Sequence, residues 1–135
     1  MKKYSFGFKV EATDIDFNGH VGNVTYLKWM IEAATRHSRA VGFGYAQCLE
    51  LGGTWVAKSH RIEYKKPAFE GEELEMQTWI ESIGKILSVR CYRLMRSSDA
   101  SVICEGETEW VFVDQRRMRP MKIPEVVIEG FKRDV

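Results

Sequence analysis

The residues with the greatest capacity for chemistry lie in one short stretch, from position 14 to position 26. It contains the carboxylates of Asp14 and Asp16, the amides of Asn18 and Asn23, and the imidazole of His20. Charged and amide groups are costly to bury without partners, so this stretch is unsuited to be a packing element. A carboxylate, an amide and an imidazole spaced two residues apart are instead typical of a site that activates water or orients a substrate.

A calcium loop is one interpretation, because residues 14–19 match four positions of the EF-hand pattern. The match fails further on. The twelfth position requires a bidentate Glu and falls on Thr25, and the ninth falls on Gly22. The preceding segment also has the alternation of a strand, whereas an EF-hand has a helix there. Calcium is therefore disfavoured, and we expect no metal in this site.

A purely structural interpretation is that these side chains cap a helix and form turns, while His20 bonds a backbone carbonyl. Capping needs one such side chain, whereas Asp16, Asn18 and His20 supply three. The structural role suits Asp14 best, which we expect to organise the turn. The third interpretation is a hydrolytic site, in which a carboxylate acts as base or nucleophile. Unsatisfied N–H groups at the start of a helix would then polarise a carbonyl.

The elements around this stretch are predicted to be a strand and a helix. Alternating apolar residues from Tyr4 to Val10 predict a strand over residues 4–11. A helix is predicted to follow, with Asn23 as its N-cap and Gly42 as its stop. Its apolar face recurs at three- and four-residue steps and consists of Leu27, Met30, Ile31, Ala34, Ser38 and Val41.

The rest of the chain is predicted to be mostly strands. A short helical turn is expected over Tyr45 to Leu51, followed by strands over residues 54–66, 74–82, 86–96 and 101–114. Short connections between successive strands predict an antiparallel meander. The expected fold is α+β, a curved antiparallel sheet of about five strands wrapped around one long central helix, with residues 1–135 forming a single domain.

Composition narrows the classes of partner. The 135 residues include 20 basic and 19 acidic ones, a formal net charge of +1, which argues against nucleic acid as a partner. The sequence contains no apolar run long enough to predict a membrane-spanning segment. Three cysteines without a metal or redox spacing favour a reducing compartment, so we expect a cytoplasmic protein. Exposed sheet edges and faces predict self-association as a homodimer or homotetramer.

The pattern D-x-D-x-x-G-H-V-x-N-x-x-Y at residues 14–26 resembles the signature of hotdog-fold acyl thioesterases. It is similar to the group that includes 4-hydroxybenzoyl-CoA thioesterases, and its D-x-N-x-H core resembles the plant acyl-carrier-protein thioesterases. The segments 62–68, 71–74 and 119–124 also look like parts of that family. The resemblance implies the hotdog fold, which agrees with the architecture expected from the strand and helix patterns.

The resemblance also implies roles for individual residues. Asp16 matches the catalytic carboxylate, and Asn18 and His20 match the amide and imidazole of the carrier-protein enzymes. The backbone N–H groups of Asn23 and Val24 fall where the family polarises the thioester carbonyl. Asp16 would either activate water or attack the thioester to form a mixed anhydride.

The implied substrate is an acyl-CoA or acyl-carrier-protein thioester of fatty acid metabolism. No cofactor is implied other than coenzyme A as part of the substrate. Lys85, with Ser88 beyond it, is the expected contact for the coenzyme A phosphates, with Lys65, Lys66 and Arg90 as alternatives. Two other functions on the same fold are an acyl-thioester binding protein without turnover and an acyl-thioester hydratase or dehydratase.

Other residues with chemical potential receive simpler interpretations. His37, beside Arg36 and Arg39, is predicted to lie on a solvated helix face. His60 is interpreted as a polar strand residue. Cys91 and Cys104 are expected to behave as small apolar side chains, because neither has an activating neighbour.

Overall fold

One antiparallel sheet of five strands forms the body of the protein in a computed structural model that describes residues 2–133. The strand order across the sheet is β1-β3-β4-β5-β2. The strands are β1 Tyr4–Lys9, β2 Gly53–Tyr64, β3 Glu73–Ile83, β4 Leu87–Arg96 and β5 Val102–Asp114. The antiparallel α+β prediction is therefore confirmed, and each predicted strand has a counterpart.

The predicted meander is correct only for the last three strands. β3, β4 and β5 are neighbours in order, but β2 pairs with β5 instead of β3, and β1 pairs with β3. Residues 65–72 do not form a tight hairpin, because their backbone is bonded elsewhere. The Ala68 carbonyl accepts the Val21 N–H, and the Glu72 carbonyl accepts the Val10 N–H, both at 2.9 Å. This connection therefore carries the chain across one end of the sheet, leaving β1 and β2 as the two edges.

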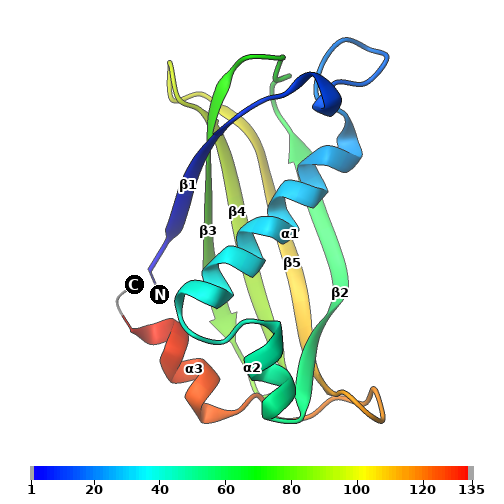
Figure 1. Ribbon diagram of the computed structural model, residues 1–135, viewed down its shortest axis with the longest axis vertical. Coiled ribbons are helices and arrows are strands. Elements are labelled where there is room, and N and C mark those ends of the chain that lie inside the picture. Colours follow the sequence, from blue (N-terminus) through cyan, green and yellow to red (C-terminus); the bar gives the residue numbers. More distant parts are fainter. Residues whose placement is uncertain (1, 134–135) are drawn as a thin grey trace.

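Helix α1, Asn23–Ala40, lies across one face of the sheet (Figure 1). Its buried side chains follow the three- and four-residue spacing of a helix stripe. They are Tyr26, Met30, Ala33, Ala34 and His37. This stripe packs against a core of sheet residues that includes Leu74, Met76, Tyr92 and Leu94. Burial of this apolar face stabilises the helix on the sheet.

The buried stripe of α1 is rotated from the predicted face. Met30 and Ala34 belong to both, but Ile31 remains 39% exposed. The prediction that His37 lies on a solvated face is wrong, since His37 is only 1% exposed. Its neighbours Arg36 and Arg39 point away from the core and remain exposed.

Two shorter helices, α2 Tyr45–Glu50 and α3 Glu125–Lys132, lie near the end of the molecule where α1 finishes (Figure 1). The predicted helical turn at residues 45–51 is thus confirmed, whereas α3 was not predicted. Their second core contains Val41, Cys48, Ile80, Phe112, Ile123, Val127 and Phe131. Gly130 permits close packing here, because a Cβ at that position would lie 2.7 Å from the Phe43 ring.

No helix within residues 2–133 combines the length and the apolar character needed to span a bilayer.

Candidate active site

The loop between β1 and α1 begins with a single 3-10 turn, Ala12–Asp14. The Asp14 carboxylate accepts the Glu11 N–H at 2.9 Å, and the Asp14 carbonyl accepts the Gly22 N–H at 3.2 Å. Asp14 therefore fixes both ends of the loop. The expectation that it organises the turn is confirmed.

Asp16 is held in the middle of this loop by its backbone and by one carboxylate oxygen. Its N–H donates to the His20 carbonyl at 2.9 Å, and its carbonyl accepts the Gly19 N–H at 3.0 Å. Gly19 has a φ of +84°, which glycine adopts without strain. The Oδ1 atom of Asp16 accepts the Asn18 N–H at 2.8 Å. No donor from residues 2–133 bonds Oδ2, so that oxygen is open to water or substrate.

The Asp16 side chain faces the start of α1. A Cβ built on Gly22 would lie 3.4 Å from the Asp16 Cβ and 3.5 Å from its Oδ2. Gly22 is the N-cap of the helix, with φ −75° and ψ 152°, so Asn23 is the first helical residue and not the cap that was predicted. The carboxylate is thus adjacent to the positive end of the helix dipole.

The first N–H groups of α1 are available to a ligand. The Thr25 N–H donates to the Gly22 carbonyl at 3.1 Å, but within the described chain the N–H groups of Asn23 and Val24 have no acceptor. Gly22 has no side chain to cap them, and Val24 is 73% exposed. A carbonyl oxygen placed here would receive two backbone donors backed by the helix dipole.

The side chains of His20 and Asn18 are differently constrained. His20 Nδ1 lies 3.1 Å from the Val21 carbonyl, and because a carbonyl only accepts, Nδ1 is assigned as the donor. The assignment leaves Nε2 as an acceptor. Asn18 contacts Asp16 through its backbone, while its exposed side-chain amide bonds to no residue in the range 2–133. All three predicted side chains therefore belong to one loop, but no direct bond joins them.

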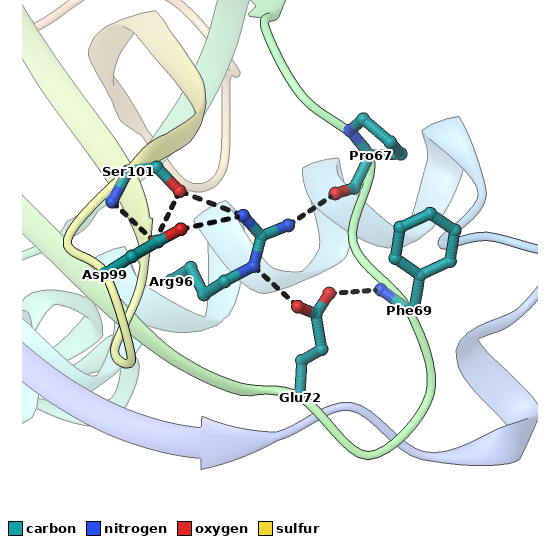
Figure 2. A network of polar contacts seen from close by, with 6 residues as sticks. All are labelled: Pro67, Phe69, Glu72, Arg96, Asp99 and Ser101. Carbon is teal, nitrogen blue, oxygen red and sulfur yellow. Dashed lines mark hydrogen bonds and ion pairs between the residues drawn. The ribbon is translucent and has the colours of Figure 1, made fainter.

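A network around Arg96 supports the connection between β2 and β3 (Figure 2). Arg96 Nε donates to the Glu72 carboxylate, and Nη2 donates to the Pro67 carbonyl at 3.0 Å. Nη1 donates to Ser101 Oγ at 2.9 Å and lies 3.6 Å from the Asp99 carboxylate. One guanidinium thus ties the β2–β3 connection to the turn between β4 and β5.

This connection in turn supports the loop that contains Asp16. Glu72, held by Arg96, accepts the Phe69 N–H at 2.7 Å (Figure 2). Ala68, which lies between Pro67 and Phe69 in the chain, is fully buried. The Ala68 carbonyl accepts the Val21 N–H, directly before the helix N-cap. The position of the loop therefore depends on Arg96 of β4, a side chain that no motif or spacing in the sequence indicated.

Lys85 and Ser88, the first choices for coenzyme A contacts, are not brought to this site within one chain, whereas two of the alternatives are close to it. Lys85 is exposed in the turn between β3 and β4, where its carbonyl accepts the Ile123 N–H just before α3. That turn lies at the opposite end of α1 from Asp16 (Figure 1). Ser88 is 4% exposed and donates to the Ser82 carbonyl, so it does not accompany Lys85 at the surface. Arg90 is buried, whereas Lys65 and Lys66 lie in the connection beside the Asp16 loop.

Exposed apolar side chains surround the loop, and sequence reasoning did not select them. Phe17 is 97% exposed, Phe69 45% and Tyr64 50%. The Tyr64 hydroxyl lies 3.5 Å from the Asn23 carbonyl, at the first turn of α1. The position of Phe17 between Asp16 and Asn18 was the available signal, because a large apolar residue inside a polar loop suggests contact with a ligand or another chain.

Outside the Asp16 loop, residues 2–133 contain neither a cluster of metal-binding side chains nor an activated cysteine. Within residues 2–133, no group of three or more His, Cys, Asp or Glu side chains is arranged to hold a metal ion. Burial raises the pKa of Cys104 to about 12 and also raises the pKa values of Cys48 and Cys91. These thiols remain protonated at neutral pH and are poor nucleophiles.

A model of the thioesterase-like superfamily matches residues 10–131, so the chain belongs to that family. It is similar to oleoyl-acyl carrier protein thioesterase 1 of Arabidopsis thaliana, at 29% identity over 95% of this chain and 37% of the plant protein. The chain thus spans a little over a third of that relative's length. It is also similar to the acyl-CoA thioester hydrolase YbgC of Escherichia coli, at 26% identity over 93% of this chain and 92% of the relative.

Solved structures agree on the fold. A 1,4-dihydroxy-2-naphthoyl-CoA thioesterase from Synechocystis superposes with a TM-score of 0.89, covering 97% of this chain and 96% of that one. The sequence identity is only 15%, so this likeness concerns the fold alone. It supports the hotdog arrangement expected from the sequence.

Proposed function

We propose that this chain hydrolyses an acyl thioester at the loop that contains Asp16. The observation that carries the proposal is the position of a carboxylate with one free oxygen beside two free helix N–H groups. A thioester carbonyl on the N–H groups of Asn23 and Val24 would be polarised toward the negative charge that develops during acyl transfer. The names of the relatives support the same reaction class, with coenzyme A or acyl-carrier protein as the thiol component.

Two chemical routes fit the free oxygen of Asp16. As a general base, Oδ2 takes a proton from water while the water oxygen attacks the carbonyl carbon, and collapse of the tetrahedral intermediate expels the thiolate. The proton then passes from Asp16 to the leaving sulfur. As a nucleophile, Oδ2 attacks the carbonyl carbon itself, the thiolate leaves, and water opens the resulting mixed anhydride. His20 Nε2 and the Asn18 amide are proposed to orient the water.

The test is release of free thiol from a panel of acyl-CoA and acyl-carrier-protein thioesters. Asp16→Asn keeps the size of the side chain and removes its charge, so kcat/KM should fall by at least about 100-fold. Asp14→Asn is the matched control, because an amide oxygen can still accept the Glu11 N–H, and it should retain most activity. Equal turnover by the wild-type protein and the Asp16 variant would refute the assigned role.

A single turnover in ¹⁸O-labelled water tests the nucleophilic route. Direct attack by water places the label in the product acid, and so does opening of a mixed anhydride at the acyl carbon, so only label on Asp16 identifies the anhydride. A mixed anhydride opened at the aspartyl carbon leaves the label on Asp16, where mass spectrometry of the protein detects it. Binding of thioesters without thiol release would favour a binding protein, and a change in enoyl absorbance would favour a hydratase or dehydratase.

We also propose that the protein acts as a cytoplasmic homo-oligomer in fatty acid metabolism, with α1 as the central helix of a hotdog domain. Support for self-association comes from β2, an edge strand whose residues 57–61 are exposed. Unpaired strand edges favour pairing with a second chain. Lys85 can contribute to coenzyme A binding only from a neighbouring copy, since its own turn is remote from Asp16.

A further inference from the structure

A cavity of about 190 Å³ lies between α1, α2 and the sheet, away from the Asp16 loop. Its wall is mostly apolar and includes Ile31, Ala34, Phe43, Trp55 and Phe131. The predicted apolar face of α1, which does not coincide with the buried stripe, contributes Ile31, Ala34 and Ser38 to this wall. That face therefore borders an open space, where it remains available to a ligand.

Arg90 lines the same cavity and is only 3% exposed. Its Nη1 donates to His37 Nδ1 at 2.9 Å and to Thr78 Oγ1 at 3.0 Å. Both acceptors are neutral. The Thr78 hydroxyl carries no charge, and burial, with a further contribution from Arg90, lowers the pKa of His37 to about 4. No carboxylate of residues 2–133 forms an ion pair with Arg90. Burial lowers the pKa of Arg90 only to about 10, so it remains a cation at neutral pH.

Several hydrogen-bond donors around the cavity have no acceptor. Arg90 Nε and Nη2 donate to no residue in the described part of the chain, yet neither atom is fully enclosed. The indole N–H of Trp110, another wall residue, is fully enclosed and has no acceptor within residues 2–133, so it does not face the open space. The cavity thus presents the unused N–H groups of Arg90 Nε and Nη2, on a guanidinium that lies over the Phe131 ring and has no carboxylate partner within residues 2–133.

An unpaired charge in such a place is energetically expensive. Removing an ion from water costs free energy, and so does each buried donor that is left without an acceptor. A carboxylate would offset both costs, because its two oxygens match the fork of a guanidinium. The surrounding apolar wall would at the same time accommodate a hydrocarbon group.

We propose that this cavity binds a carboxylate attached to a compact apolar body, with the carboxylate on Arg90 and the body against the wall formed by α1, Phe43 and Trp55. The size is appropriate, since an apolar cavity of roughly 150 Å³ holds a benzene molecule. Arg90 is nearly fully buried, whereas the wall residues Ile31 on α1 and Tyr45 on α2 are exposed. The carboxylate therefore lies at the inner end and the apolar body points toward Ile31 and Tyr45.

The position of the cavity leaves two sources for such a carboxylate. His37, which contacts Arg90, lies on the order of 20 Å along α1 from Asn23, at about 1.5 Å per residue. A compact ligand therefore does not reach both Arg90 and the Asp16 loop. The carboxylate belongs either to a free carboxylic acid or to the far end of a long acyl chain whose thioester lies at Asp16. Only the second source rests on the proposed function.

The first experiment compares hexanoate with hexanamide, which has a similar shape and no charge. Binding is followed by tryptophan fluorescence, since Trp55 and Trp110 line the cavity. The wild-type protein should bind hexanoate at least tenfold more tightly than hexanamide, and Arg90→Met should abolish that preference. No binding, equal affinities in the wild-type protein, or a preference that survives in the variant would each overturn the proposal.

A second variant guards against misfolding of Arg90→Met. Thr35→Phe places a large side chain at the wall from an exposed position on α1 and does not touch the Arg90 contacts. It should fold normally by circular dichroism and weaken hexanoate binding at least tenfold. Unchanged binding in a folded Thr35→Phe protein would contradict this location of the ligand.

The two sources are separated by thioester substrates. Hexadecanoyl-CoA is compared with its ω-carboxy derivative in the wild-type protein and in Arg90→Met. A preference for the ω-carboxy substrate that the variant loses assigns the cavity to the acyl chain, whereas hexanoate binding without that preference assigns it to a free acid. If no thioester is hydrolysed, the proposed function fails, but the hexanoate measurements still decide whether the cavity binds carboxylates.

Discussion

The two carboxylate oxygens of Asp16 have different environments, and this difference is the most informative feature at the scale of single residues. Oδ1 is fixed by the Asn18 N–H at 2.8 Å, while Oδ2 lies beside Gly22 and receives no donor from residues 2–133. One oxygen thus orients the group, and the other is left for chemistry. A glycine at the N-cap adds to this arrangement, because a Ser, Thr or Asp there would occupy the helix N–H groups itself.

His37 provides a prediction for the pH dependence of stability. Its pKa is about 4 in the folded protein and 6.5 in an unfolded chain, so the unfolded state binds the proton more readily. The stabilisation is complete above pH 6.5 and is lost as the pH falls toward 4. Thermal unfolding between pH 7 and pH 4.5 should show a fall of several degrees in Tm, since about 1 kcal/mol corresponds to roughly 4 °C.

The control for this prediction is a pair of glutamine variants. His37→Gln should flatten the Tm profile over that pH range, because glutamine does not titrate. The exposed His60→Gln should retain the fall. Identical profiles in the wild-type protein and His37→Gln would show that His37 does not carry the effect.

Residue types and spacing were sufficient to select Asp16, Asn18 and His20 as members of one loop, because the signal is local. They were insufficient for His37, because the charged neighbours Arg36 and Arg39 indicate a solvated face although the His37 side chain is buried. The spacing from Met30 through Ala33 to His37 was the signal for burial. Its partner Arg90 lies on a strand far along the chain, and no local pattern connects the two.

Among the elements, the connection between β2 and β3 has the clearest testable role. Arg96→Met removes its bonds to Glu72, the Pro67 carbonyl and Ser101, and should lower the free energy of unfolding by about 1–3 kcal/mol. It should also lower kcat/KM roughly tenfold, because Ala68 no longer holds Val21 firmly in place. Urea unfolding and the thiol-release assay measure the two effects.

The comparison variant for Arg96 is Arg93→Met on the same strand. Arg93 pairs with Glu105, but the two side chains are 35% and 37% exposed, so the loss should stay within about 1 kcal/mol. Its activity should be unchanged. Equal losses of stability in the two variants would mean that the Arg96 network has no special role.

Local patterns predicted the elements better than their arrangement. The alternation from Tyr4 to Val10 and the strands after Gly53 were read correctly, because strand periodicity is a property of a short segment. The neighbours of β2 were not, since the backbone bonds of Ala68 and Glu72 are made to a loop more than forty positions earlier. Helix α3 was missed although Pro124 at its start and the spacing of Val127 and Phe131 were available signals.

At the scale of the whole molecule, the exposed edge of β2 predicts self-association. Analytical ultracentrifugation should give a molar mass two or four times that of the 15.6 kDa chain, as expected for a homodimer or a homotetramer. If a twofold axis passes through β2 at Ala57, Ala57→Asp brings two like charges together and should favour the monomer. Ala46→Asp, exposed on α2, is the matched control. A monomer at all concentrations in the wild-type protein would contradict the prediction.

The strand order also determines when the loop that contains Asp16 can form during folding. β3, β4 and β5 form successive hairpins, but β1 must wait for β3, since Tyr4 pairs with Thr78, and β2 must wait for β5, since Gly53 pairs with Asp114. Contacts between distant parts of a chain close slowly, because the entropy of a large loop is lost before they are made. During synthesis, the segment with Asp16 is made before the Ala68 carbonyl that accepts the Val21 N–H. The Asp16 loop therefore takes its final position only after the connection between β2 and β3 has been made.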